Sequence, residues 1–98
     1  MSGMHTLRIE HRVQDYDRWK QVFDSDPADR KGSGVRAYRV MRAVDEHDLV
    51  LIDLDFDTVE AAQAMHHKML GIWAGPGRAV MVSPTARVVE SVEVEQLS

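Results

Sequence analysis

The sequence predicts an α+β fold whose elements follow in the order β-α-β-β-α-β. Residues that alternate between apolar and polar mark four strands, and apolar residues at helical spacing mark two helices between them. With right-handed crossovers, this order gives a ferredoxin-like arrangement, in which a four-stranded antiparallel sheet carries both helices on one face. We expect one domain over residues 1–98, near the lower end of the sizes that fold on a single core.

The first third of the chain predicts a strand, a helix and a polar connection. Residues 5–13 alternate, and one face of this strand carries His5, Leu7, Ile9, His11 and Val13. Asp15 is a good helix N-cap, and Tyr16, Trp19, Val22 and Phe23 follow it on one helical face. Pro27 ends this helix, and residues 28–34 predict a flexible connection.

The middle of the chain predicts a hairpin, with strands over residues 35–44 and 49–55 and a charged turn over residues 45–48. A tight hairpin sets Val44 opposite Leu49 and continues that register along both strands. This register gives Arg39 and Met41 the same face as Val50 and Ile52, which is the face toward the helices.

The rest of the chain predicts a helix and a final strand. Asp57, followed by Glu60, is the expected N-cap of the helix. Gly71 and the Gly-Pro-Gly sequence at residues 75–77 are expected to bound it. A valine-rich strand over about residues 85–95 completes the sheet.

Composition narrows the functional classes. A formal net charge of -4 is unfavourable for binding nucleic acid, because phosphate contacts need a clustered basic face. The chain has no cysteine, which excludes disulfides and thiolate nucleophiles. We find neither a secretory signal nor an apolar run approaching the ~20 residues that span a bilayer. We therefore expect a cytoplasmic protein with no membrane and no nucleic-acid partner.

The sheet face away from the helices is too apolar to remain in water. The predicted register places five large apolar side chains there among charges: Tyr38, Val40, Val44, Leu49 and Leu51. Pairing with the sheet of a second copy buries them, and two-fold dimers are the commonest assembly. The sequence therefore predicts a homodimer.

Several stretches of the chain carry a family resemblance. They are Val-Gln-Asp-Tyr-Asp-Arg-Trp at residues 13–19, Val-Phe-Asp at 22–24, the small-residue run ending at Gly34, and Asp-Phe-Asp-Thr-Val-Glu-Ala-Ala at 55–62. On these stretches the chain resembles the dimeric α+β barrel superfamily, within it the antibiotic-biosynthesis-monooxygenase-like proteins, and more narrowly a subgroup of small bacterial proteins without assigned function. The resemblance implies a dimer whose two sheets form a barrel with the helices outside.

The resemblance also implies a range of activities. Some members are oxygenases that need no metal or flavin, and others degrade haem, decarboxylate or have no known activity. Several enzymatic members carry a helix histidine, to which His66 is similar in position. Haem-degrading relatives use an asparagine and a tryptophan, whereas this sequence has no asparagine and carries Phe56 about where the tryptophan would be. This departure is unfavourable for haem degradation.

Three polar residues are candidates for chemistry in the layer between sheet and helices: His11, Arg39 and His66. His66 lies in the apolar sector of the second helix, while the adjacent His67 points to water. An imidazole can act as a base and a guanidinium can hold an oxyanion, so we assign His66 as base, Arg39 as anion stabiliser and His11 as an assisting group. The expected pocket walls are aromatic and apolar: Tyr16, Trp19, Met41, Phe56 and Trp73.

Each of these residues also has a structural interpretation. An inward histidine is commonly a core residue bonded to backbone, and Arg39 can extend from the sheet into water. The histidines at 66 and 67 lack the i, i+4 spacing of a helical metal site, so we expect neither metal nor cofactor. Asp53 and Asp55 share a face with arginines of the neighbouring strand, which predicts ion pairs.

Two functions remain open. The first is a homodimer that binds a small apolar or aromatic ligand between sheet and helices without catalysis. The second is a cofactor-independent monooxygenase, or a related small-molecule enzyme, with His66 as base. A cavity on the order of a few hundred Å³ beside His66 and either His11 or Arg39 favours the enzyme. A His66 sealed in the core favours the binding protein.

Overall fold

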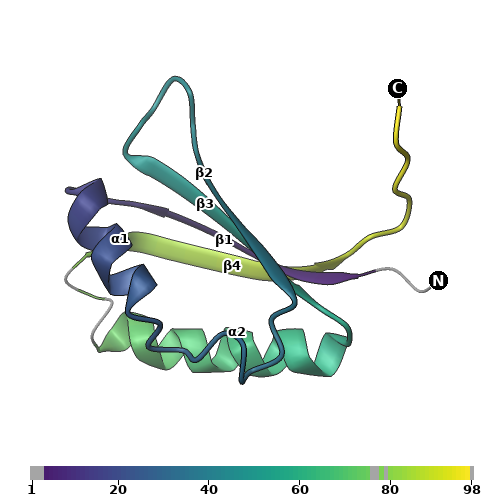
Figure 1. The fold of residues 1–98 in the computed structure, drawn as a ribbon. Coiled ribbons are helices and arrows are strands. Elements are labelled where there is room, and N and C mark those ends of the chain that lie inside the picture. The colour runs from purple at the N-terminus through teal and green to yellow at the C-terminus, as the bar shows by residue number, and fades with distance from the viewer. Residues whose placement is uncertain (1–3, 76–77, 79, 98) are drawn as a thin grey trace.

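Four strands and two helices follow in the predicted order in a computed structural model of the chain, which describes residues 4–75, 78 and 80–97 (Figure 1). The elements are β1 (His5–Arg12), α1 (Tyr16–Asp24), β2 (Ala37–Arg42), β3 (Leu49–Phe56), α2 (Val59–Ala74) and β4 (Val82–Glu90). Every strand pair is antiparallel, in the spatial order β2-β3-β1-β4. The predicted ferredoxin-like α+β fold is confirmed. In the described part of the chain, no helix has the length and apolarity needed to cross a membrane.

The core lies between the sheet and the two helices. Period-two alternation turns the apolar residues of β1 and β3 to this side, where they are buried: Leu7, Ile9, Val50, Ile52, Leu54 and Phe56. Trp19 and Phe23 cover them from α1, and Ala62 and Met65 cover them from α2. Each fully buried large side chain contributes roughly 1.5–3 kcal/mol, so this layer is the main source of stability.

The first helix begins as predicted. Asp15 has extended backbone angles, and its carboxylate accepts a hydrogen bond from the Arg18 N–H at 3.2 Å. This bond satisfies one of the amides that a helix start leaves without a partner.

The predicted cap of the second helix is wrong. Thr58, rather than Asp57, has the extended backbone of an N-cap, and its Oγ1 accepts a hydrogen bond from the Ala61 N–H at 3.1 Å. Asp57 instead pairs with Arg36 at 2.7 Å. The helix continues through Gly71, where an added Cβ would meet nothing within 4 Å, and its C-cap is Gly75. The other two residues of the expected Gly-Pro-Gly turn lie outside the described residues.

The predicted hairpin register is wrong by one residue. Arg42 lies opposite Val50 and Met41 opposite Leu51, because the connection contains Val44 in addition to the four polar residues 45–48. A one-residue shift exchanges the two faces of a strand. Tyr38, Val40 and Arg42 therefore face the helices.

No helix of the described residues covers the other face of the sheet, and we call this the open face. From β2 it receives Arg39 and Met41, which were expected on the opposite side. Its half-buried apolar residues come from three strands: Met41, Leu49, Leu51 and Val89. Tyr38 and Val40, expected here, are absent from it.

The last strand is displaced relative to the prediction. β4 begins at Val82 and ends at Glu90. The expected strand covered about residues 85–95, so the observed strand begins and ends earlier. The Ser91 N–H still donates to the Met4 carbonyl oxygen at 2.9 Å. Residues 92–97 then leave the sheet and extend away from it, on the side opposite α2 (Figure 1).

Candidate ligand site

An apolar cavity of about 50 Å³ lies between the sheet and the helices. Ile9, Ile52 and Leu54 form its floor on the sheet. Its walls come from α1, from the segment after α1, from the C-terminal half of α2, and from the residues before β4: Trp19, Val22, Phe23, Pro27, Ala28, Arg30, Met69, Ile72, Trp73, Val80 and Met81. Such a space is smaller than the roughly 150 Å³ in which an engineered apolar cavity holds benzene. A ring-sized ligand therefore has to displace side chains, and Met69 and Met81 are flexible enough to move.

His11 is buried, with 1% of its surface exposed, and it is not itself one of the residues that line the cavity. Its ring centroid is 5.1 Å from that of Trp19, whose side chain lines the cavity. β4 bulges opposite it, because Ser83 and Pro84 together oppose the single residue His11. Ser83 has the left-handed φ of 50°, a strained conformation for a residue other than glycine. The sheet is thus locally distorted around this histidine.

The two nitrogens of His11 have different surroundings. Nδ1 lies 3.2 Å from the Arg12 carbonyl oxygen, which can only accept a hydrogen bond, so Nδ1 carries the proton. Nε2 is buried and has no hydrogen-bond partner among the described residues. Burial lowers the pKa of His11, and the backbone hydrogen bond to Arg12 opposes this only in part. At neutral pH the ring is therefore uncharged, with an unused lone pair on Nε2.

His66 is half-buried on α2, and it is not one of the described residues that line the cavity. Helical geometry explains its position. Lys68, two residues later and about 200° around the helix, donates to the Ala28 carbonyl oxygen at 3.1 Å and to Ser33 Oγ at 2.6 Å. Because Lys68 faces the connection between α1 and β2, His66 lies on the opposite flank of the helix. His67 is exposed, as predicted from the same geometry.

Arg39 lies on the open face, on the other side of the sheet from His11. It donates to Asp53 Oδ2 at 3.0 Å, and Arg8 donates to both carboxylate oxygens of Asp53 at 2.9 Å. Arg8 lowers the pKa of this carboxyl most strongly, by hydrogen bonding, while burial opposes the effect and Arg39 adds to it. The predicted Asp53 ion pair is therefore confirmed. The expected convergence of His11, Arg39 and His66 is not observed.

The five expected pocket residues are distributed over four places in the structure. Trp19 and Trp73 line the cavity. Tyr16 packs on Trp19 with ring centroids 5.6 Å apart and lies beneath the Arg42 guanidinium. Phe56 is fully buried further along β3, and Met41 lies on the open face.

Several lining residues were missed in the sequence. Ala28 belongs to a segment that composition marks as flexible, yet it is 3% exposed. Val80 and Met81 precede β4 and were assigned to no element. The apolar spacing of Met69, Ile72 and Trp73 and the apolar run at residues 80–82 are the signals that could have identified this wall.

The cavity can hold a small apolar molecule, and the one buried side-chain atom without a hydrogen-bond partner in the described part of the chain, His11 Nε2, belongs to a ring that contacts the cavity-lining Trp19. The neutral Nε2 of His11 is an acceptor, or a base for a weakly acidic O–H or C–H. No group of three or more histidine, aspartate or glutamate residues in the described part of the chain could hold a metal ion.

Known structures resemble this fold closely, although the sequences differ. No family model matches the sequence, and no curated protein is significantly similar to it. A mutant of SnoaB from Streptomyces nogalater, described as a cofactor-independent oxygenase, has a TM-score of 0.75 at 13% identity, over 93% of this chain and 95% of its own. A candidate antibiotic biosynthesis monooxygenase from Bordetella bronchiseptica has a TM-score of 0.73 at 12% identity, and the match covers 93% of this chain and 99% of that protein. A protein from an uncultured marine organism, described as dimeric and ferredoxin-like, has a TM-score of 0.66 at 7% identity, and the match covers 100% of this chain and 95% of that protein.

At these identities the similarity is one of fold. It agrees with the resemblance carried by the sequence motifs and with the strand order of the sheet. The chain thus has the ferredoxin-like α+β fold of the antibiotic-biosynthesis-monooxygenase-like structures.

Proposed function

We propose that the protein is a homodimer of the monooxygenase-like α+β barrel type that binds a small apolar or aromatic ligand in the cavity between sheet and helices. The apolar cavity itself carries this proposal, because it lies where the sheet and both helices meet. Its size favours a ligand of at most one ring. His11 contacts Trp19 in the cavity wall, and in this proposal its unpaired Nε2 is the polar group that orients a ligand with one hydroxyl once that wall moves.

The homodimer is supported by the open face. Met41, Leu49, Leu51 and Val89 give it an apolar surface that a second sheet can bury. Its central carboxylate, Asp53, already receives three hydrogen bonds from two arginines, so covering this carboxylate does not leave it without a partner. Sedimentation equilibrium is expected to give twice the mass of the chain. A monomer at micromolar concentration would contradict this part of the proposal.

Tryptophan fluorescence tests the ligand site directly. The chain has two tryptophans, Trp19 and Trp73, and both line the cavity. Titration with benzene, phenol and cyclohexane is expected to change the emission in a saturable way. Ala28→Leu fills the cavity and is expected to weaken binding at least about tenfold, or ~1.4 kcal/mol.

The control is Ala64→Leu, which makes the same change at an exposed position of α2. It is expected to bind like the unmodified protein. If none of the three probes gives saturable binding, or if both variants bind equally well, the cavity is not a ligand site.

A cofactor-independent monooxygenase is the second candidate, and the neutral, buried His11 is the observation that favours it. In this reaction the substrate hydroxyl gives its proton to Nε2, and the resulting anion gives electrons to O₂. The similarity in fold to SnoaB, described as a cofactor-independent oxygenase, supports this class. His11 thus replaces His66 as the preferred base, and Arg39, on the open face, has no part in it.

Oxygen uptake with a panel of hydroxylated aromatic compounds separates the two candidates. Uptake that disappears in His11→Phe and remains in His66→Ala supports catalysis by His11. The reverse pattern restores the base predicted from the sequence. Uptake no faster than in buffer alone contradicts the enzyme and leaves the binding protein.

A further inference from the structure

Arg30 is the one charged residue among the described residues that line the apolar cavity. Its side chain is only 14% exposed. Arg30 also lines an open groove of about 640 Å³ beside the start of β2. Among the described residues it is the only one that lines both spaces, so it forms the boundary between the cavity and the groove.

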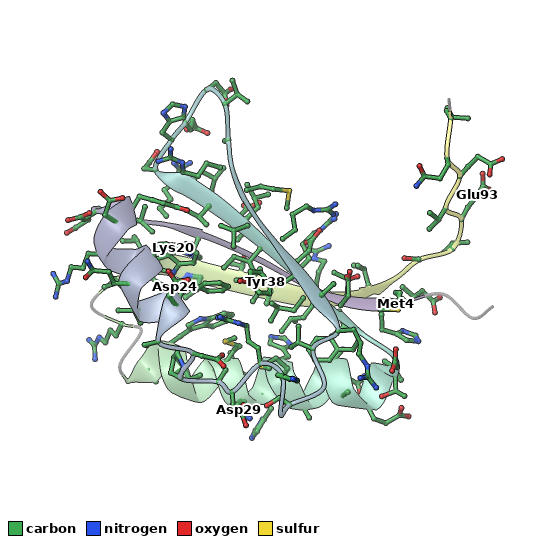
Figure 2. All side chains as sticks on the ribbon, in the orientation of Figure 1. Met4, Lys20, Asp24, Asp29, Tyr38 and Glu93 are labelled. Carbon is green, nitrogen blue, oxygen red and sulfur yellow. The ribbon has the colours of Figure 1, made fainter. Side chains whose placement is uncertain are left out.

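Two aromatic rings hold the guanidinium of Arg30 at this boundary. Its Cζ lies 3.9 Å from the ring centroid of Phe23 and 4.9 Å from that of Tyr38, and the two rings are 5.4 Å apart. Phe23 belongs to the cavity. Tyr38, labelled in Figure 2, extends from β2 toward α1 and belongs to the groove. Stacking on a ring uses the flat face of a guanidinium and leaves its N–H edge for polar contacts.

The connection between α1 and β2 fixes the backbone of Arg30. Its N–H donates to Asp26 Oδ1 at 2.9 Å, and its carbonyl oxygen accepts from the Val35 N–H at 3.0 Å. Lys68 anchors the same connection to α2 by donating to the Ala28 carbonyl oxygen. A group that is already held in place loses little freedom when a ligand binds to it.

The guanidinium has donors to spare. Nη1 donates to the Phe23 carbonyl oxygen at 2.8 Å. Nε lies 3.5 Å from Asp26 Oδ1, which is longer than an ordinary N–H···O hydrogen bond. A guanidinium has five N–H donors, and these contacts engage two of them. The planar edge that remains matches the two oxygens of a carboxylate.

The charge of the groove favours an anion. Three basic residues line it, Arg30, Lys31 and Arg36, against one acidic residue, Asp26. Lys31 is exposed, and Arg36 pairs with Asp57 while 65% of its side chain stays open to solvent. The chain as a whole carries a net charge of -4, so the groove is a local exception. A cleft lined by one sign of charge concentrates ligands of the opposite sign.

We propose that the ligand is a small aromatic or apolar carboxylate. Its apolar part enters the cavity, and its carboxylate stays in the open groove on Arg30, which makes Arg30 the residue that selects for charge. The inference rests on the ligand site of the proposed function and names the ligand class of that site. The carboxylate needs no burial in the cavity, because Arg30 reaches both spaces.

Benzoate and benzamide test this assignment, because they have the same ring and nearly the same shape and differ in charge. Titration by tryptophan fluorescence at low salt is expected to show benzoate binding at least about tenfold more tightly than benzamide. Arg30→Gln is expected to remove this preference by weakening benzoate alone. Arg30→Lys keeps the charge without the planar fork and is expected to retain part of the preference.

The control is Arg18→Gln, the same change at an exposed position of α1 that lines neither space, and it is expected to keep the full preference. If Arg30→Gln weakens benzamide as much as benzoate, Arg30 only shapes the wall, and the assignment is overturned.

The unmodified protein separates this inference from the proposed ligand site without any variant. Saturable binding of benzene or phenol, together with equal affinities for benzoate and benzamide, would overturn the carboxylate and leave the ligand site in place. If none of these probes binds in a saturable way, both proposals fail.

Discussion

Replacing His11 with phenylalanine is expected to stabilise the protein and to weaken its dependence on pH. His11 has a buried Nε2 without a partner, and such a group costs about 1–3 kcal/mol. The same substitution removes the hydrogen bond between Nδ1 and the Arg12 carbonyl oxygen, which contributes about 0.5–1.5 kcal/mol. At pH 8 we therefore expect a net gain of about 1 kcal/mol in the free energy of unfolding.

The pH dependence follows from the lowered pKa of His11. At pH 8 the imidazole is neutral in both the folded and the unfolded chain and contributes nothing to the dependence. As the pH falls below the ordinary histidine value of 6.5, the unfolded chain takes up a proton that the folded chain does not. Stability then falls by at most about 1.4 kcal/mol between pH 7.5 and 5.5, and this loss continues until the folded pKa is reached.

Urea unfolding at pH 8.0, 6.5 and 5.5, at one fixed protein concentration, measures both effects. Keeping the concentration fixed matters because dimerisation contributes to the apparent stability. The exposed His67, replaced with glutamine, is the control and is expected to keep the slope of the unmodified protein. Equal slopes in His11→Phe and in the unmodified protein would refute the argument, because the slope does not depend on how well the larger ring packs.

Two further substitutions test the remaining polar contacts. Asp53→Ala removes three hydrogen bonds to arginines that are more than half exposed, so we expect a loss of about 2 kcal/mol at pH 7, measured by urea unfolding. Because the folded pKa of Asp53 is lowered, this contribution is fully present above the ordinary value of 3.8 and is lost as the pH falls through the folded value. A difference as large at pH 2 as at pH 7 would contradict this reasoning. Thr58→Ala removes an N-cap and is expected to lower the free energy of unfolding by about 1 kcal/mol. Asp57→Ala removes only an exposed ion pair and is expected to lower it by less than about 0.5 kcal/mol. If thermal unfolding shows the larger loss for Asp57→Ala, Asp57 is the cap.

Most of the fold could be predicted from the sequence, because the patterns that specify it are local. Alternation in residues 5–13 identifies β1, and helical spacing after Asp15 identifies α1. The hairpin register could not be read in the same way. Four polar residues between Val44 and Leu49 suggest a four-residue turn, but Val44 itself belongs to the connection and is 92% exposed. This single residue moves Arg39 and Met41 to the open face.

The candidate site could be predicted only in part. The inward orientation of His11 and the position of Trp19 follow from strand and helix periodicity. The burial of the cavity wall near Ala28 does not follow from this periodicity, because it depends on contacts between residues that are distant in sequence. One of these is the hydrogen bond from Lys68 to the Ala28 carbonyl oxygen.

The sequence by itself determined the element order, the inward direction of His11 and an apolar layer between sheet and helices. All of these follow from periodicities of two and 3.6 residues, which operate over a few positions. The tertiary structure alone decided which side of the sheet receives Arg39, that His66 does not line the cavity, and that Val92 and Val94 after β4 are exposed. These features depend on how separate elements meet, and a single residue in a turn is enough to change them.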